Sequence, residues 1–229
     1  MNFLETVQKA RRMCGIVGTG PTTLVSQTGI YQKLAEWVAD ADVMIQGQWV
    51  NWDFLRTTNT FNLSADVRDY TLASLNITDH NMWAVDSFIR DSTAPTYQVL
   101  THLPYHEWYM LYKNGTQTTG TPTHFTVKPT RALAFYPIPD ATYAVDADYF
   151  RSPQRMSANT DTSLIPSQYH DILVYRAKML YAESEDAQEV YQLASADYAR
   201  VLAQLEAHSL PNAEHATGLS TTNLVVRVE

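Results

Sequence analysis

The stretch from Ile165 to Asp186, IPSQYHDILVYRAKMLYAESED, limits the possible folds more than any other part of the sequence. Pro166 suits the first turn of a helix, and Ser167 is a candidate N-cap. Apolar residues then recur at helical spacing: Ile172, Tyr175, Met179, Leu180 and Ala182. After a polar break the same rhythm returns: Val190, Leu193, Ala194, Val201 and Leu205. The pattern predicts an αα-hairpin against which the other elements pack.

Two more helices are predicted near the N-terminus, over residues 2–14 and 28–47, from apolar residues at the same spacing. The segment between them, GIVGTGPTTLVSQTG, resembles a phosphate-binding loop only superficially, because it lacks the Lys and the glycine spacing of those motifs. We interpret it as a loop between helices. Trp49, Trp52 and Phe54 follow the second helix, and we expect this aromatic cluster to anchor a core.

The periodicity changes between residues 56 and 155. Short β-type runs over 58–63, 67–72 and 82–89 precede a short helix predicted over Tyr105–Tyr112. HFTVKP, RALAFYP and TYAVDADYF then predict three strands, and the apolar middle one suggests a central position in a small sheet. The predicted class is α+β: a helical bundle from 1–55 and 156–210, a β-rich insertion lobe over 56–155, and an extended tail over 211–229.

The tail turns abruptly apolar near its end, at Leu224, Val225, Val226 and Val228. Because such residues favour strands, we expect the tail to dock on a partner, either a portal or a neighbouring subunit, by strand addition. The alternative is a final edge strand of the chain's own sheet.

Charge and cysteine content exclude some classes of function. The net charge is −8 and no basic run is present, which argues against a surface built to bind nucleic acid. A single cysteine, Cys14, fits a reducing compartment, and we expect neither a membrane span nor a signal peptide. Charged residues make up only 17%, below the usual quarter or so, and Tyr and Trp are abundant. Both a protein interface and a tightly packed monomer fit this composition.

Candidate chemical groups do not assemble into a catalytic or metal motif. His106–Glu107 begins like a zinc-protease helix, but Met110 stands where the second His is required. Asp146 and Asp148 alternate along a predicted strand and share a face, as two hydrolase carboxylates would, although solvated acidic pairs are common. We therefore expect no cofactor, no metal and no enzymatic activity.

Four segments in order resemble the head-to-tail adaptor (connector, or head completion) proteins of tailed bacteriophages. They are WVNWDFLR, VRDYTL, RALAFYPIPDATYAVDADYFRSPQ and IPSQYHDILVYRAKMLYAESED, within roughly residues 37 to 205. The resemblance implies a structural virion protein at the neck between head and tail, assembled in the host bacterial cytoplasm. It implies a homo-oligomeric ring, usually a dodecamer, below the portal and above a tail or nozzle protein.

Such a ring continues the channel for DNA ejection, and double-stranded DNA passes through its lumen without specific binding. An acidic subunit suits a channel wall that repels phosphate. We expect Arg176 and Lys178, on the polar face of the predicted hairpin helix, to contact a ring neighbour.

Two alternatives come from other classes. A tail-associated peptidoglycan hydrolase would use an acidic pair such as Asp146 and Asp148, and Glu107 is a further candidate. A monomeric binding module would use the β lobe to recognise a ligand. Cell-wall digestion and oligomeric mass separate these from an adaptor.

Overall fold

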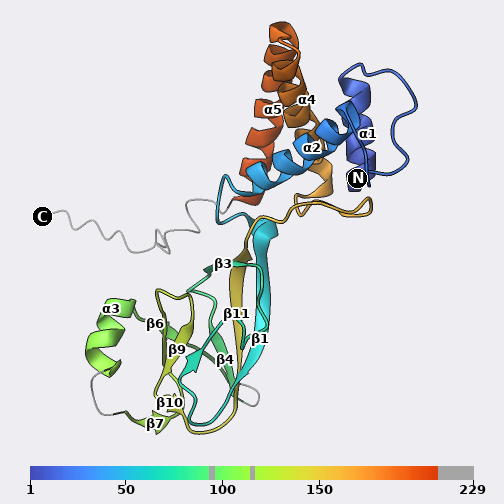
Figure 1. Ribbon diagram of the computed structural model, residues 1–229. Helices are drawn as coiled ribbons and strands as arrows, with labels where there is room; N and C mark the ends of the chain where they lie inside the picture. The colour runs from blue at the N-terminus through green and yellow to red at the C-terminus, as the bar shows by residue number, and fades with distance from the viewer. Residues whose placement is uncertain (93–95, 114–116, 211–229) are drawn as a thin grey trace, which may run out of the picture. The chain divides into compact units, whose positions relative to one another are not determined.

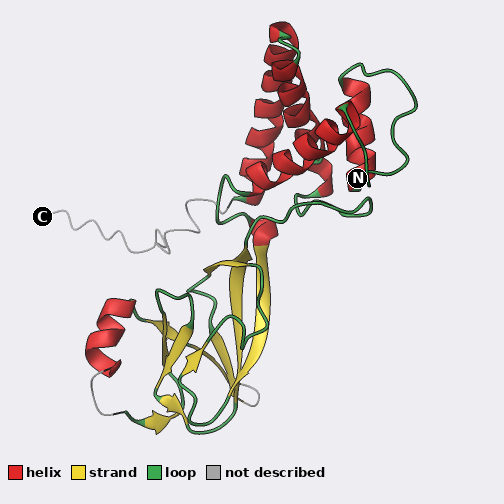
Figure 2. Cartoon of the chain, in the orientation of Figure 1, coloured by secondary structure: helices red, strands yellow, loops and turns green. Residues whose placement is uncertain are grey.

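The computed structural model describes residues 1–92, 96–113 and 117–210. The chain forms two compact units, one from Met1–Leu55 together with the chain from Pro153 onward, the other from Arg56–Ser152. Figure 1 shows helices in the first unit, and Figure 2 shows strands with one short helix in the second. The predicted α+β class is confirmed. None of the described helices combines the length and apolar character needed to cross a membrane.

The helical unit is organised around an antiparallel hairpin, α4 and α5, with α2 and α1 packed against α4. Its helices are α1 (Phe3–Met13), α2 (Ile30–Gln46), α4 (Asp171–Ser184) and α5 (Gln188–Ser209), with short 3-10 turns η1 (Asp53–Leu55) and η3 (Ser167–Tyr169). Ile172, Val174 and Ala177 are among the residues that α4 buries.

Helix α1 begins where its sequence predicts. Asn2 Oδ1 accepts the Glu5 N–H at 2.8 Å, and Glu5 Oε2 accepts the Asn2 N–H at 2.9 Å, which completes a capping box. Helix α2 begins two residues later than predicted, because Gly29 precedes it with a φ of 62° that favours glycine.

The prediction that Ser167 caps the hairpin's first helix is wrong. Ser167–Tyr169 form a separate 3-10 turn after Pro166, and no side chain caps α4, which begins at Asp171. His170, buried between the turn and the helix, places Nε2 2.8 Å from the Ile165 carbonyl oxygen. This buried contact within the segment holds the turn before α4 begins.

The aromatic cluster after α2 divides between core and surface. Trp52 is fully buried, stacks on Phe54 and donates its Nε1–H to the Ile45 carbonyl at 3.1 Å. Trp49 is 45% exposed and donates to Glu206 Oε1 on α5 at 3.0 Å. The expectation of a core anchor therefore holds for Trp52 and not for Trp49.

Leu193 departs from the predicted apolar stripe of α5, because it is 68% exposed. Helix α5 packs mainly on α4, so only a narrow stripe of α5 is buried, at Ala194, Val201, Leu205 and Ser209.

The loop between α1 and α2 wraps around a buried arginine. Arg11 donates Nη1–H groups to the carbonyls of Ile16, at 2.8 Å, and of Gly18. A side chain at Gly20 would place its Cβ 2.9 Å from Arg11 Nε. The glycines of this loop thus leave room for Arg11, which agrees with the interpretation as a structural loop.

The polar linker over residues 157–164 is tied to the rest of the helical unit. Asn159 accepts the Leu24 N–H at 2.8 Å and donates to Thr23 Oγ1 at 2.9 Å. Asp161 Oδ2 accepts the N–H groups of Ser157 and Ala158, and these bonds lower the pKa of the Asp161 carboxyl. The linker is therefore an ordered part of the unit.

The β unit contains two main sheets, with strand orders β1-β11-β4-β5 and β2-β9-β8-β6; β3 also pairs with β11, and β10 pairs with β7. The longer strands are β1 (Arg56–Leu63), β3 (His80–Trp83), β4 (Ile89–Ser92), β5 (Thr96–Val99), β8 (His124–Val127), β9 (Leu133–Tyr136) and β11 (Tyr143–Arg151). The two-residue strands are β2 (Asp69–Tyr70), β6 (Thr101–His102), β7 (Thr119–Gly120) and β10 (Ile138–Pro139).

Strand β9 lies between β2 and β8 and buries Leu133, Ala134 and Phe135, so its predicted central position is confirmed. The runs predicted over 67–72 and 82–89 are shorter strands displaced along the sequence, at β2, β3 and β4. Local hydrogen-bonded turns interrupt them, such as the one in which Ser87 donates its N–H to the Ala84 carbonyl at 3.0 Å.

The predicted helix over Tyr105–Tyr112 is present as α3 (Tyr105–Trp108), which continues as a π-helical turn, η2 (Tyr109–Lys113). Trp108 is buried, and the Arg68 guanidinium lies 5.2 Å from the centre of its ring.

Candidate functional site

The two residues predicted to contact a ring neighbour lie on different sides of α4. Arg176 is half-buried near α5, where its positive charge partly offsets the burial that raises the pKa of Tyr198. Lys178 is half-buried near the end of α1; its charge opposes the burial that raises the pKa of Cys14 to about 11. The structure does not bring the two cations together on one patch, and their contact with a neighbour stays a prediction.

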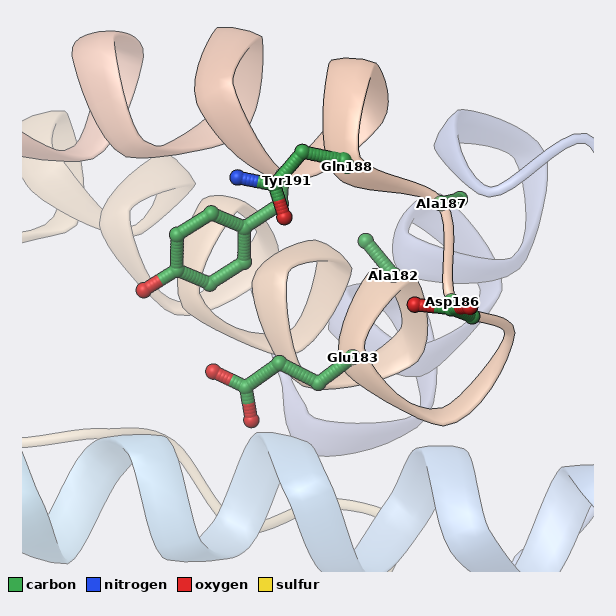
Figure 3. A pocket seen from close by; sticks show the side chains of 6 residues that line it. All are labelled: Ala182, Glu183, Asp186, Ala187, Gln188 and Tyr191. Atoms are coloured by element: carbon green, nitrogen blue, oxygen red, sulfur yellow. The ribbon is translucent and has the colours of Figure 1, made fainter.

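A pocket of about 250 Å³ lies at the tip of the α4–α5 hairpin. Figure 3 shows Glu183 and Tyr191 pointing in the same direction, with Asp186 at the turn. The remaining lining residues are Ala182, Ala187 and Gln188. Its open, acidic walls offer a contact for a cationic side chain but no arrangement of a nucleophile with a base.

The acidic pair that a hydrolase would use is already engaged by neighbouring side chains. Asp146 accepts the Thr60 hydroxyl at 2.5 Å. Asp148 accepts the Thr58 hydroxyl at 2.6 Å and forms a salt bridge of 2.7 Å with Arg56. The two carboxylates share one face of β11, as predicted. Their cross-strand partners give each of them a structural role on that face.

The histidines near α3 do not form a metal site within the described ranges. His102 packs against Phe125, with ring centroids 5.3 Å apart, and burial lowers its pKa. His106 and Glu107 are exposed on α3. No group of three or more potential metal ligands occurs among residues 1–92, 96–113 and 117–210.

In the sheet that contains β11, the strands β1 and β5 pair on one side only among the described residues. Leu100 donates its N–H to the Phe88 carbonyl at 2.9 Å, so the register of β4 and β5 turns the main-chain groups of Tyr97 and Val99 away from β4. At the other edge, Asp148 uses its main-chain carbonyl and N–H to bond Ala84 and Ser87, so these groups point away from β1. Because such groups alternate along paired strands, the main-chain groups of Thr58, Thr60 and Asn62 point away from β11, toward the open edge.

The two edges differ in their side chains. Tyr97 and Val99 on β5 are 73% and 64% exposed. The β1 edge instead carries polar residues, and beside it lies a pocket of about 440 Å³ whose walls are mostly Asn, Ser and Thr. The β5 edge was not among the sites predicted from the sequence. The alternating apolar residues of TYQVL were its only local signal.

Large apolar side chains are also exposed elsewhere on the surface of each unit. In the helical unit they follow one another near the end of α2: Met44, Trp49 and Val50. In the β unit Met110 and Leu111 on η2 are 67% and 59% exposed. The predicted docking residues Leu224, Val225, Val226 and Val228 lie outside the described residues.

Comparison with known protein families gives one match. The sequence model described as SU10 adaptor protein matches residues 1–221, which span both compact units. No curated protein matches the chain.

Proposed function

Because the chain belongs to the SU10 adaptor protein family, a family of phage adaptors, we propose that it is a structural virion protein that joins the head of a tailed phage to its tail. In this proposal copies of the chain form a closed ring below the portal and continue the channel for DNA. The match over residues 1–221 carries the proposal, because it includes the helical unit and the whole β unit.

The surface of each unit supports a role in assembly. Large apolar side chains are exposed on both units, including Trp49 in one and Met110 in the other. An isolated soluble protein rarely gains from such exposure, whereas an interface buries it. A ring of more than two copies needs two different contact surfaces per copy, and we propose the exposed apolar residues of the two units as candidates for them.

The acidic balance supports passage of DNA without capture. With 16 Lys and Arg against 24 Asp and Glu, the chain has few cations to neutralise phosphate. A lumen lined by Lys and Arg would contradict this part of the proposal.

The decisive experiment mixes the purified full-length chain with the portal ring and measures the mass of the product. A discrete complex containing one ring of the chain, seen by native mass spectrometry and by electron microscopy, supports an adaptor. A chain that stays monomeric, or that binds the portal without forming a ring, contradicts the proposed assembly. The copy number follows directly from the mass.

A further inference from the structure

The β5 edge is a preformed acceptor for an additional strand. The main-chain groups of Tyr97 and Val99 point outward, and no described residue pairs with them. Strand β5 is itself held in place, because Arg90 of β4 donates a hydrogen bond to the Gln98 side chain and is 5% exposed. The edge can therefore accept main-chain hydrogen bonds without first rearranging.

The exposed side chains of this edge are unusual for an unprotected one. Open edges are normally shielded by charged side chains, by proline or by a bulge, because an apolar edge promotes uncontrolled pairing. The described part of β5 carries Tyr97 and Val99 instead, both largely exposed. Across the sheet, Val99 lies in one row with Ile89, Asp146 and Thr60, so the outer face changes from apolar at β5 to polar at β1.

The end of the chain has the complementary pattern. Leu224, Val226 and Val228 would share one face of a strand, with Val225 and Arg227 on the other. The chain beyond Leu210 comprises residues 211–229, which could reach roughly 60 Å when extended. A strand formed at the end of the chain could therefore reach well beyond α5. The apolar face of that strand would match the apolar residues of β5 on the outer face of the sheet.

We propose that residues 224–228 of one copy add as a strand to the β5 edge, at Tyr97 and Val99, of a second copy. The contact is heterologous, since tail and edge are different surfaces, so it can repeat around a ring. The inference rests on the proposed ring and specifies one of its contacts. The β1 edge is a poorer acceptor because its outward side chains are Thr58, Thr60 and Asn62.

Cysteine cross-linking tests the contact directly. Cys14 is replaced by Ala, Val99→Cys is introduced in a tagged full-length chain, and each residue from 224 to 228 is changed to Cys in an untagged one. The two chains are mixed with portal and oxidised. We expect a mixed disulfide at alternate tail positions, because neighbouring strands place facing Cβ atoms about 5 Å apart. Thr60→Cys in place of Val99→Cys is the matched control on the other edge.

Several results would overturn the inference. They are no mixed disulfide, equal cross-linking to Thr60→Cys, or cross-linking at every tail position. The mass of the portal complex is measured in parallel. Rings without the cross-link refute only this contact, whereas the absence of rings refutes the proposed assembly.

A proline substitution supplies an independent readout, with the cross-linking cysteine moved to Tyr97→Cys on the same edge because residue 99 is itself changed. Val99→Pro removes an N–H that points away from β4, so the sheet keeps its own hydrogen bonds. We expect an unchanged melting temperature and a roughly tenfold loss of the mixed disulfide. Val99→Thr keeps the N–H and should retain the cross-link. Full cross-linking of a folded Val99→Pro chain would contradict strand addition.

Discussion

The rings of Phe88 and Phe125 stack with their centroids 3.9 Å apart and join the two sheets of the β unit. Phe88 immediately precedes β4, whereas Phe125 belongs to β8 in the other sheet. Both are fully buried, and Phe125 also packs near Phe135. The pair therefore forms the centre of the core of this unit.

Phe125→Ala should destabilise the β unit by about 3–5 kcal/mol, because it removes a buried ring and leaves a cavity. Urea unfolding followed by tryptophan fluorescence measures this change. Phe125→Leu should cost clearly less. Equal midpoints for Phe125→Ala and the wild type would show that the two sheets do not depend on this contact.

His80 should make the stability of the β unit depend on pH. It is 7% exposed beside Trp83 and Tyr149, and burial together with the nearby Arg131 charge lowers its pKa to about 4. The unfolded chain binds a proton near pH 6.5 and the folded chain does not, so stability falls as pH decreases from about 6.5 to 4. His80→Phe should reduce this loss, whereas His106→Phe, at an exposed site, should not. Denaturant titrations across this range provide the test.

Asp42 should give the opposite dependence in the helical unit. It is fully buried, accepts the Ser163 hydroxyl at 2.6 Å, and has a pKa raised chiefly by burial. The folded chain therefore holds this proton more tightly than the unfolded chain, and stability is lost as pH rises through the raised pKa. Asp42→Asn should remove that loss, which thermal melts at a series of pH values would reveal. Asp40→Asn, at an exposed position, is the control; an identical pH profile for Asp42→Asn and the wild type would refute this assignment.

Deletion of residues 217–229 should leave a folded chain that no longer assembles into a ring on the portal, because the proposed contact between copies is lost. The described helices end at Ser209, before the deletion begins, so the circular dichroism spectrum and the melting temperature should be unchanged. Native mass spectrometry of the mixture with the portal measures ring assembly. Replacing only Leu224, Val225, Val226 and Val228 by Ser should have the same effect, and a complete ring formed by either variant would exclude the proposed tail contact between copies.

The chain should not digest bacterial cell walls. Asp148 is neutralised by Arg56, and Asp146 is bound by Thr60, so neither is free in the arrangement that a glycosidase needs. Turbidity of a peptidoglycan suspension measures this activity. Digestion by the wild type that is lost in Asp146→Asn or Glu107→Gln would establish an enzyme.

The sequence by itself determined the class of fold and the position of most helices. The apolar spacings from Ile172 to Ala182 and over residues 2–14 are local, and the structure contains both helices. The central strand over Leu133–Tyr136 was also predictable, because residues that are apolar on both faces need cover on both sides.

Only the tertiary structure decided which residues of those elements are buried, which side chains form hydrogen bonds or ion pairs, and which strand edge stays unpaired. Leu193 has the right spacing for a core yet faces solvent, because α5 packs chiefly on one neighbour. Asp146 and Asp148 acquire their partners from β1, which lies far away in sequence. The open edge at Tyr97 and Val99 depends on which strands pair, and strand order arises from contacts between distant segments that no local pattern encodes.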